Sequence, residues 1–207
     1  MSAEGHRIFA ALYDHLNASA ERTWLGQRRG RLLDRASGKV LEIGAGTGAN
    51  LAYYHGVERV VLAEPDPAMR ARLGGHLERA GVPIQVSSAP AEDSGFPEAS
   101  FDTVVCTMVL CSVADPCAAL SEMRRVLRPG GLLLGLEHVR GEGSRARWQD
   151  FVTPLWRRVG AGCHPNRDTV AAIGRCGFDI EATELFDPPR VPALIRPFVE
   201  VVARRPA

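Results

Sequence analysis

The sequence has almost no net charge. Its 25 Lys and Arg residues nearly balance 24 Asp and Glu residues, which leaves a formal net charge of +1. Domains that bind nucleic acid usually carry a strongly basic surface, so no nucleic-acid partner is expected. Basic runs at 28–31 and 124–125 are interpreted as solvated helix faces.

Long apolar runs are also missing. No stretch approaches the roughly 20 consecutive apolar residues that a membrane helix needs. Residues 1–7 lack the apolar segment of a secretory signal peptide. We therefore expect no membrane span and a cytoplasmic location, with the chain acting as a monomer or a homodimer.

The cysteines form no recognisable framework. They are odd in number and include no CxxC pair, which argues against disulfides and structural zinc. Buried small side chains are the default interpretation of such thiols. His164 follows Cys163 directly, but no third ligand is spaced nearby, so no metal site is expected. The five positions are Cys106, Cys111, Cys117, Cys163 and Cys176.

Internal repeats, low-complexity tracts and linkers are absent as well, which predicts that residues 1–207 form a single domain. Short apolar runs alternate with longer amphipathic ones. Strands are predicted at 39–43, 59–63, 82–87, 101–107, 132–139, 178–186 and 198–203. Helices are predicted within 6–36 and at 67–80, 116–127, 144–160 and 166–176.

Apolar strands that are each followed by a helix indicate a parallel sheet covered on both faces. The predicted fold is α/β, with a doubly wound, mostly parallel seven-stranded sheet and N-terminal helices. In such sheets the ligand lies beyond the carboxyl ends of the strands. The loops after the first five strands are therefore the expected site.

A glycine-rich loop, residues 44–48, follows the first predicted strand. Glycine allows positive φ and a close approach of ligand to backbone. Gly44, Gly46 and Ala49 also satisfy the dinucleotide pattern G-x-G-x-x-G/A. A nicotinamide-dependent oxidoreductase is therefore an alternative that the loop alone leaves open.

Acidic residues around the loop favour a different ligand. Glu42 lies two positions before it, where a negative charge does not help to bind a pyrophosphate but suits an ammonium and a sulfonium group. Glu64, about 20 residues further on, fits the ribose of either ligand. The chain also leaves no room for a separate catalytic domain. A sulfonium cofactor is favoured over a dinucleotide.

Four short motifs occur in order within residues 38–139. They are VLEIGAGTG at 40–48, Glu64-Pro65-Asp66, Ser100-Phe101-Asp102, and LRPGG at 127–131. This ordered set resembles the class I methyltransferases that use S-adenosylmethionine (SAM). The resemblance implies a helical cap at 1–37, a SAM-binding core at 38–139, and acceptor-side helices and last strands at 140–207.

The resemblance also implies roles for individual residues toward SAM. The glycine loop supports the methionyl part, Glu64 holds the ribose, and Ala91 and Glu92 border the adenine amino group. Pro65 and Met69 flank the adenine, and Tyr13-Asp14 resembles a short motif that folds over the cofactor. Pro90 departs from the pattern, since many relatives carry Asp there, so adenine recognition relies on its two successors. The implied cofactor-binding residues are Tyr13, Glu42, Gly44, Ala45, Gly46, Thr47, Gly48, Asn50, Glu64, Pro65, Met69, Ala91, Glu92 and Thr107.

Three further stretches, at 104–113, 137–139 and 160–164, resemble one branch of this family, the methyltransferase-like enzymes of vertebrates that methylate alkyl thiols. Those enzymes carry an N-terminal membrane anchor, which we do not expect in this chain because residues 1–37 contain no long apolar run. The resemblance implies a small-molecule acceptor, with a thiol favoured. The alternatives are O-, N- or C-methylation of a metabolite, and a non-catalytic SAM-binding module.

Three residues are candidates for the acceptor side. Thr107 ends the fourth strand, beside the expected position of the methyl group, and His138 ends the fifth strand. His138 is the first choice for a base or an acceptor-positioning group. His164 lies in a glycine-rich loop placed to cap the pocket. Each also has a purely structural interpretation, as do Trp24, Trp148 and Trp156, which either line an apolar acceptor site or belong to the core.

Overall fold

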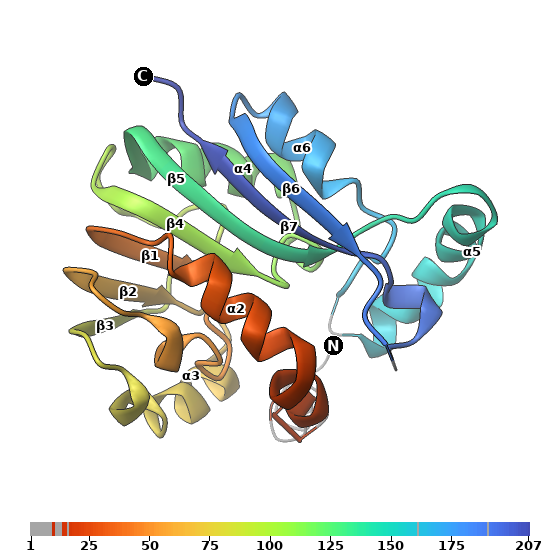
Figure 1. Cartoon of the computed structure of the whole chain (residues 1–207), viewed down its shortest axis with the longest axis horizontal. Helices are drawn as coiled ribbons and strands as arrows, with labels where there is room; N and C mark the ends of the chain where they lie inside the picture. The colour runs from red at the N-terminus through yellow and green to blue at the C-terminus, as the bar shows by residue number, and fades with distance from the viewer. Residues whose placement is uncertain (1–9, 11–13, 16, 161, 190) are drawn as a thin grey trace.

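The fold is a seven-stranded sheet with helices on both faces (Figure 1). The computed structural model describes residue 10 and residues 14–15, 17–160, 162–189 and 191–207. The strands are β1 (Lys39–Ile43), β2 (Arg59–Ala63), β3 (Ile84–Ser87), β4 (Phe101–Thr107), β5 (Leu127–His138), β6 (Asp179–Phe186) and β7 (Phe198–Arg204). The helices are α2 (Gly26–Leu33), α3 (Pro67–Gly74), α4 (Pro116–Val126), α5 (Gly143–Val159) and α6 (Thr169–Arg175). Short turns of π or 3₁₀ helix are η1 (Glu21–Leu25), η2 (Leu51–Tyr53), η3 (Leu77–Arg79) and η4 (Ala193–Ile195).

The strand order is β3-β2-β1-β4-β5-β7-β6. Neighbours from β3 to β5 pair in parallel, whereas β7 runs antiparallel to both β5 and β6. The carboxyl ends of β1, β2, β4 and β5 therefore meet at one edge of the sheet. This topology confirms the predicted doubly wound, mostly parallel α/β fold.

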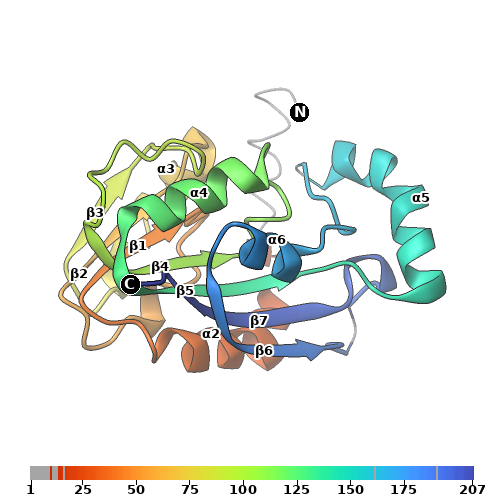
Figure 2. The ribbon, with the colours of Figure 1, turned by 90° about the horizontal axis from the view of Figure 1, so that it is seen from above.

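The two faces of the sheet are covered by different helices. Figure 2 shows α4 and α6 on one face and α2 on the other, with α5 beyond the edge at which β4 and β5 end. Side chains alternate between two cores: Leu41 packs with the α4 side, and Val40 packs with the α2 side. Both are fully buried, and truncation of such a core leucine to alanine typically costs about 2–5 kcal/mol.

Two helices begin where the sequence predicts a helix start, at an Asp followed by Pro. Asp66 precedes Pro67 and accepts hydrogen bonds from the amides of Ala68 and Met69, which caps α3. Asp115 caps α4 in the same way, accepting from the amides of Cys117 and Ala118. These caps place the loops that follow β2 and β4 at the sheet edge.

Several predicted boundaries were wrong. Helix α3 ends at Gly74, because the chain tightens into η3 instead of continuing to residue 80. Strand β5 begins at Leu127, which pairs with Phe101, while Leu132 pairs with Thr103, so LRPGG is a bulge inside the strand. The edge strand β6 is also largely exposed to solvent, whereas every strand was expected to be apolar and covered on both faces. Among the described residues, no helix combines the length and apolar character needed to cross a membrane.

Candidate active site

The glycine loop turns sharply at the end of β1 and is tied to β2. Gly44 and Gly48 have φ values of +65° and +88°, which side chains rarely adopt. A Cβ on Gly44 would lie 2.6 Å from Cγ2 of Val109, and one on Gly48 would lie 2.6 Å from Cδ1 of Leu51. The amides of Gly44 and Ala45 both donate to the carbonyl of Ala63 at the end of β2. The loop therefore needs glycine for conformation and for space.

Glu64 joins this loop to the end of β2. Its Oε2 accepts from the amide of Gly46, and its Oε1 accepts from the amide of Asp66, each at 2.8 Å. The side chain is 7% exposed, and burial raises its pKa although both amides oppose that shift. Each carboxylate oxygen keeps a lone pair for another donor. The structure thus holds the predicted ribose carboxylate directly against the glycine loop.

The N-terminal segment reaches over the loop through Asp14. The Oγ1 of Thr47 donates to its Oδ1 at 2.5 Å, and Nη2 of Arg72 on α3 lies 3.2 Å from its Oδ2. His76 approaches the carbonyl of Thr47 at 2.8 Å. The predicted Tyr13 lies outside the described residues. Its neighbour Asp14 contacts the glycine loop, and the role of the Tyr13-Asp14 motif toward the cofactor stays a prediction.

Glu42 lies beneath the loop, in a buried network. Its Oε2 accepts from Oη of Tyr54 at 2.7 Å, and its Oε1 accepts from Nδ2 of Asn50 at 3.0 Å. Burial raises the pKa of Glu42 to about 7, although Tyr54, Arg29 and Asn50 favour its charged form. Both oxygens are engaged with protein donors, so the network fixes Glu42 and Asn50 together.

Arg29 of α2 completes the network. Its Nη1 donates to Oδ1 of Asn50 at 2.8 Å and to Oγ1 of Thr107 at 2.7 Å, and its Nε lies 3.1 Å from a carboxylate oxygen of Glu21. The interpretation of residues 28–31 as a solvated face was wrong for this residue, which is 2% exposed. Its spacing from Leu25 and Leu32 puts it on the buried face of the helix, a signal present in the sequence.

The residues expected around the adenine follow β2 and β3. Pro65 is exposed and Met69 is half-buried at the start of α3. Ala91 is buried, and Oε1 of Glu92 accepts from the amides of Ala114 and Asp115 before α4. The structure places Met69 in the first turn of α3 and the other three residues on loops, at the edge that carries the glycine loop.

The turn after β4 has a strained backbone and is fixed by hydrogen bonds to a buried carboxylate of β5. Met108, directly after Thr107, has a φ of +57°, and such strain is typical of functional loops. The amides of Val109 and Leu110 donate to Oε1 of Glu137, which is fully buried. Burial raises the pKa of Glu137 well above its usual value. Glu137 of β5 therefore fixes the turn that packs against Gly44.

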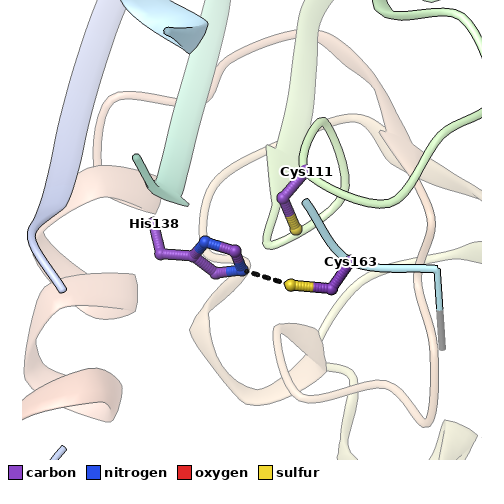
Figure 3. Close-up of side chains that lie close together, drawn as sticks. All are labelled: Cys111, His138 and Cys163. Atoms are coloured by element: carbon purple, nitrogen blue, oxygen red, sulfur yellow. Dashed lines mark hydrogen bonds between the residues drawn. The ribbon is translucent and has the colours of Figure 1, made fainter. Parts of the chain in front are cut away.

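Beyond this turn, Cys111, His138 and Cys163 form a cluster (Figure 3). Nε2 of His138 lies 3.2 Å from Sγ of Cys163, and the three ligand atoms lie within 4.8 Å of one another. Nε1 of Trp156 donates to the same sulfur at 3.1 Å. No third ligand is spaced near Cys163 in the sequence, but the fold brings Cys163 together with Cys111 from the loop after β4 and His138 at the end of β5.

Charge and burial act together in this cluster. The Cys163 thiol hydrogen-bonds to Cys111 and, with nearby His138, lowers the pKa of Cys111 despite its burial. Burial alone would lower the pKa of His138, but the attraction and hydrogen bonding of Cys111 outweigh it and raise that pKa. Nδ1 of His138 is buried without a partner among the described residues. All five cysteines lie in the described part of the chain and are free thiols.

The three acceptor-side candidates separate into two groups. Thr107 belongs to the Arg29 network and bonds side chains instead of backbone. His164 lies beside the cluster, with Nδ1 3.2 Å from the carbonyl of Cys111, and burial lowers its pKa. His138 and His164 therefore converge on Cys111. Of the tryptophans, Trp156 touches the cluster, whereas Trp148 is 47% exposed on α5.

This strand order, the glycine loop and the carboxylate at the end of β2 together define a class I SAM-dependent methyltransferase. The methyltransferase domain family matches residues 41–135. The chain is 40% identical over 182 residues to human thiol S-methyltransferase TMT1B, which covers 83% of this chain and 72% of that protein. It is 31% identical over 199 residues to human thiol S-methyltransferase TMT1A, with 92% and 80% covered. The chain belongs to the family of these thiol S-methyltransferases.

A solved structure supports the fold independently. A Bacillus halodurans protein described as a methyltransferase superimposes with a TM-score of 0.73 over 87% of this chain and 100% of that chain, at 16% identity. Membership of the methyltransferase family identifies the protein as an enzyme that uses SAM as methyl donor, which sets aside the nicotinamide oxidoreductase and the non-catalytic SAM-binding module.

Proposed function

We propose that this methyltransferase transfers the methyl group of SAM to the sulfur of a small-molecule thiol in the cytoplasm. The observation that carries the proposal is its 40% identity, over most of both chains, to a relative named for thiol S-methylation. The second supporting feature is a buried acceptor side, where His138 ends β5 beside the turn after β4.

On the cofactor side, the proposal assigns SAM to the edge formed by the glycine loop and Glu64. Glu64 is already oriented by the amides of Gly46 and Asp66, so its remaining lone pairs are available for ribose hydroxyls. The Arg29 network holds Thr107 and Asn50 in one arrangement beside the loop. A preorganised site of this kind loses little conformational freedom when the cofactor binds.

The chemistry asks little of the protein beyond alignment. The acceptor sulfur attacks the methyl carbon, the bond between that carbon and the sulfonium breaks, and S-adenosylhomocysteine leaves as a neutral thioether. Such an in-line displacement depends mainly on the positions of the three reacting atoms. A thiol with a reference pKa near 8.5 is about 3% ionised to the thiolate at pH 7. A weak base or a nearby cation is enough to hold the attacking thiolate, and His138 is the side chain proposed for that task.

The test is an acceptor panel with methyl-labelled SAM. Alkyl thiols, aryl thiols, phenols, amines and carbon nucleophiles of similar shape are compared in one assay. The proposal expects labelled thioether from at least one thiol and far slower labelling of its oxygen analogue. Turnover of phenols, amines or carbon nucleophiles without any thiol would keep the methyltransferase and reject the thiol acceptor.

A further inference from the structure

The cluster of Cys111, His138 and Cys163 has the composition of a metal site. Two thiols and one imidazole are the donors that zinc prefers, and Cys₂His is a known three-ligand set. The donors come from the loop after β4, the end of β5 and the loop between α5 and α6. We infer that these three side chains bind one thiophilic divalent cation, Zn²⁺.

The separations suit such an ion. With Zn–S near 2.3 Å and Zn–N near 2.0 Å, tetrahedral angles put neighbouring donor atoms roughly 3.4–3.8 Å apart. The distance from Nε2 of His138 to Sγ of Cys163 is 3.2 Å, and no pair in the cluster exceeds 4.8 Å. Shifts of a few tenths of an ångström to about one ångström would bring all three donors onto a single ion.

Charge balance favours the ion in this buried place. The side chains of Cys111, His138 and Cys163 are all at most 8% exposed. Two thiolates and one neutral imidazole around Zn²⁺ have no net charge, whereas an isolated buried charge is costly. Binding requires both thiols to lose their protons, which pass to the solvent, and no electron is transferred.

Polar groups around the cluster contact the two sulfur atoms and would stabilise them as thiolates. The indole N–H of Trp156 donates to Sγ of Cys163, and Oγ of Ser112 lies 3.3 Å from Sγ of Cys111. Arg167 donates to the carbonyls of Leu110 and Val113, which lie on either side of Cys111 in the loop. Its positive charge is therefore held close to that cysteine. Bonds of this kind orient ligands and stabilise thiolates.

An ion in this place would join the loop between α5 and α6 to the sheet edge. It would also occupy Nε2 of His138, so the role of base proposed above for that side chain applies to the metal-free protein alone. Three protein ligands leave one position of a tetrahedral ion open for water or another donor. The inference does not depend on the acceptor, since binding of the ion is measured without any methyl transfer.

Cobalt is the probe, because Co²⁺ replaces Zn²⁺ and reports its ligands by absorption. Reduced, metal-free full-length protein is titrated with CoCl₂ under anaerobic conditions. We expect one Co²⁺ per chain, a thiolate-to-cobalt charge-transfer band, intense visible bands of a tetrahedral site, and displacement of all of them by one equivalent of Zn²⁺. No charge-transfer band at stoichiometric Co²⁺ would overturn the inference.

Variants assign the sulfur atoms. Cys111→Ser and Cys163→Ser should each weaken Zn²⁺ binding by more than roughly 100-fold, since loss even of an outer partner of a ligand costs 10–100-fold. The exposed Cys117→Ser is the matched control and should leave the spectrum unchanged. If the cluster variants fail to fold, a chain with Cys106→Ala, Cys117→Ser and Cys176→Ser retains just Cys111 and Cys163. Loss of the cobalt bands in that chain, once its SAM binding is shown to be intact, would reject the assignment.

Discussion

Arg29 of α2 donates a hydrogen bond of 2.7 Å to the hydroxyl of Thr107 at the end of β4, 78 residues away in sequence. The same nitrogen donates to Asn50, whose amide reaches Glu42 under the glycine loop. A single buried cation therefore connects the helical cap to two strand ends. This connection is the structural basis of the first prediction.

Replacement of Arg29 should destabilise the fold strongly. Arg29→Met removes the positive charge near Glu42 and the donor to the buried Oδ1 of Asn50 and Oγ1 of Thr107, and each buried acceptor that loses its donor costs about 1–3 kcal/mol. Denaturant unfolding measures this loss as a lower midpoint. The exposed Arg31→Ala on the same helix is the control and should change stability by less than about 0.5 kcal/mol. Equal effects at the two positions would contradict the role of Arg29.

Glu64→Gln should weaken cofactor binding, and it also removes one of the two bonds that hold the side chain, because the amide nitrogen of Gln cannot accept from Gly46 or Asp66. A neutral amide loses the charge-assisted bonds to two ribose hydroxyls, each contributing about 1.5 kcal/mol, which together correspond to roughly 100-fold in affinity. Isothermal titration with SAM and with S-adenosylhomocysteine should show the same loss. Glu58→Gln is the control, because Glu58 is exposed just before β2. Unchanged affinity in the Glu64 variant would show that the ribose is held elsewhere.

The burial of Glu42 predicts a dependence of stability on pH. Its pKa is raised from 4.5 to about 7 in the folded state, so the folded chain binds more protons than the unfolded chain between those values. The stabilising effect of the protonated form is complete below about pH 4.5 and is lost as the pH rises through 7, a change of about 3 kcal/mol at most.

Unfolding measured from pH 5 to 8 tests this prediction by comparison with Glu42→Gln, which does not titrate. The stability of the unmodified protein relative to the variant should fall as the pH rises. A constant difference, or one that grows with pH, would mean that Glu42 is ionised throughout the range.

Gly44→Ala should impair both folding and SAM binding. Alanine at a φ of +65° is strained, and its Cβ would lie 2.6 Å from Cγ2 of Val109, so a loss of about 1–3 kcal/mol is expected. The double variant Gly44→Ala with Val109→Ala should recover part of that loss, since it removes the overlap but not the strain. Gly74→Ala is the control because a Cβ there meets no atom within 4 Å. If the stability losses of the single variants Gly44→Ala and Val109→Ala simply add in the double variant, the overlap with Val109 does not contribute to the cost of alanine at position 44.

The fold was largely predictable because apolar runs and caps mark most strands and helices locally. β1, β2 and β4 were predicted at their observed bounds, and Asp66 and Asp115 begin the predicted helices. The edge strand β6 was predicted within one residue of its observed bounds, but its exposure was not, because the exposure of a strand depends on its place in the sheet.

The site was predictable only where its residues adjoin one another or a strand end. The glycine loop and Glu64 are of this kind. Arg29 was missed because neighbouring arginines suggested a solvated face, although its spacing from buried leucines indicates the opposite. The cluster was missed because 25 residues separate His138 from Cys163, and their meeting depends on how two loops fold against the end of β5. Contacts of that kind follow from tertiary structure and not from local pattern.

The most direct test of the account is the position of the transferred methyl group. The protein is incubated with isotope-labelled SAM and an equimolar mixture of an alkyl thiol and its matched alcohol, and the products are separated by mass spectrometry. The account predicts labelled thioether together with S-adenosylhomocysteine in equal amounts, little labelled ether, and loss of both products in Glu64→Ala. Labelled ether without thioether would contradict it.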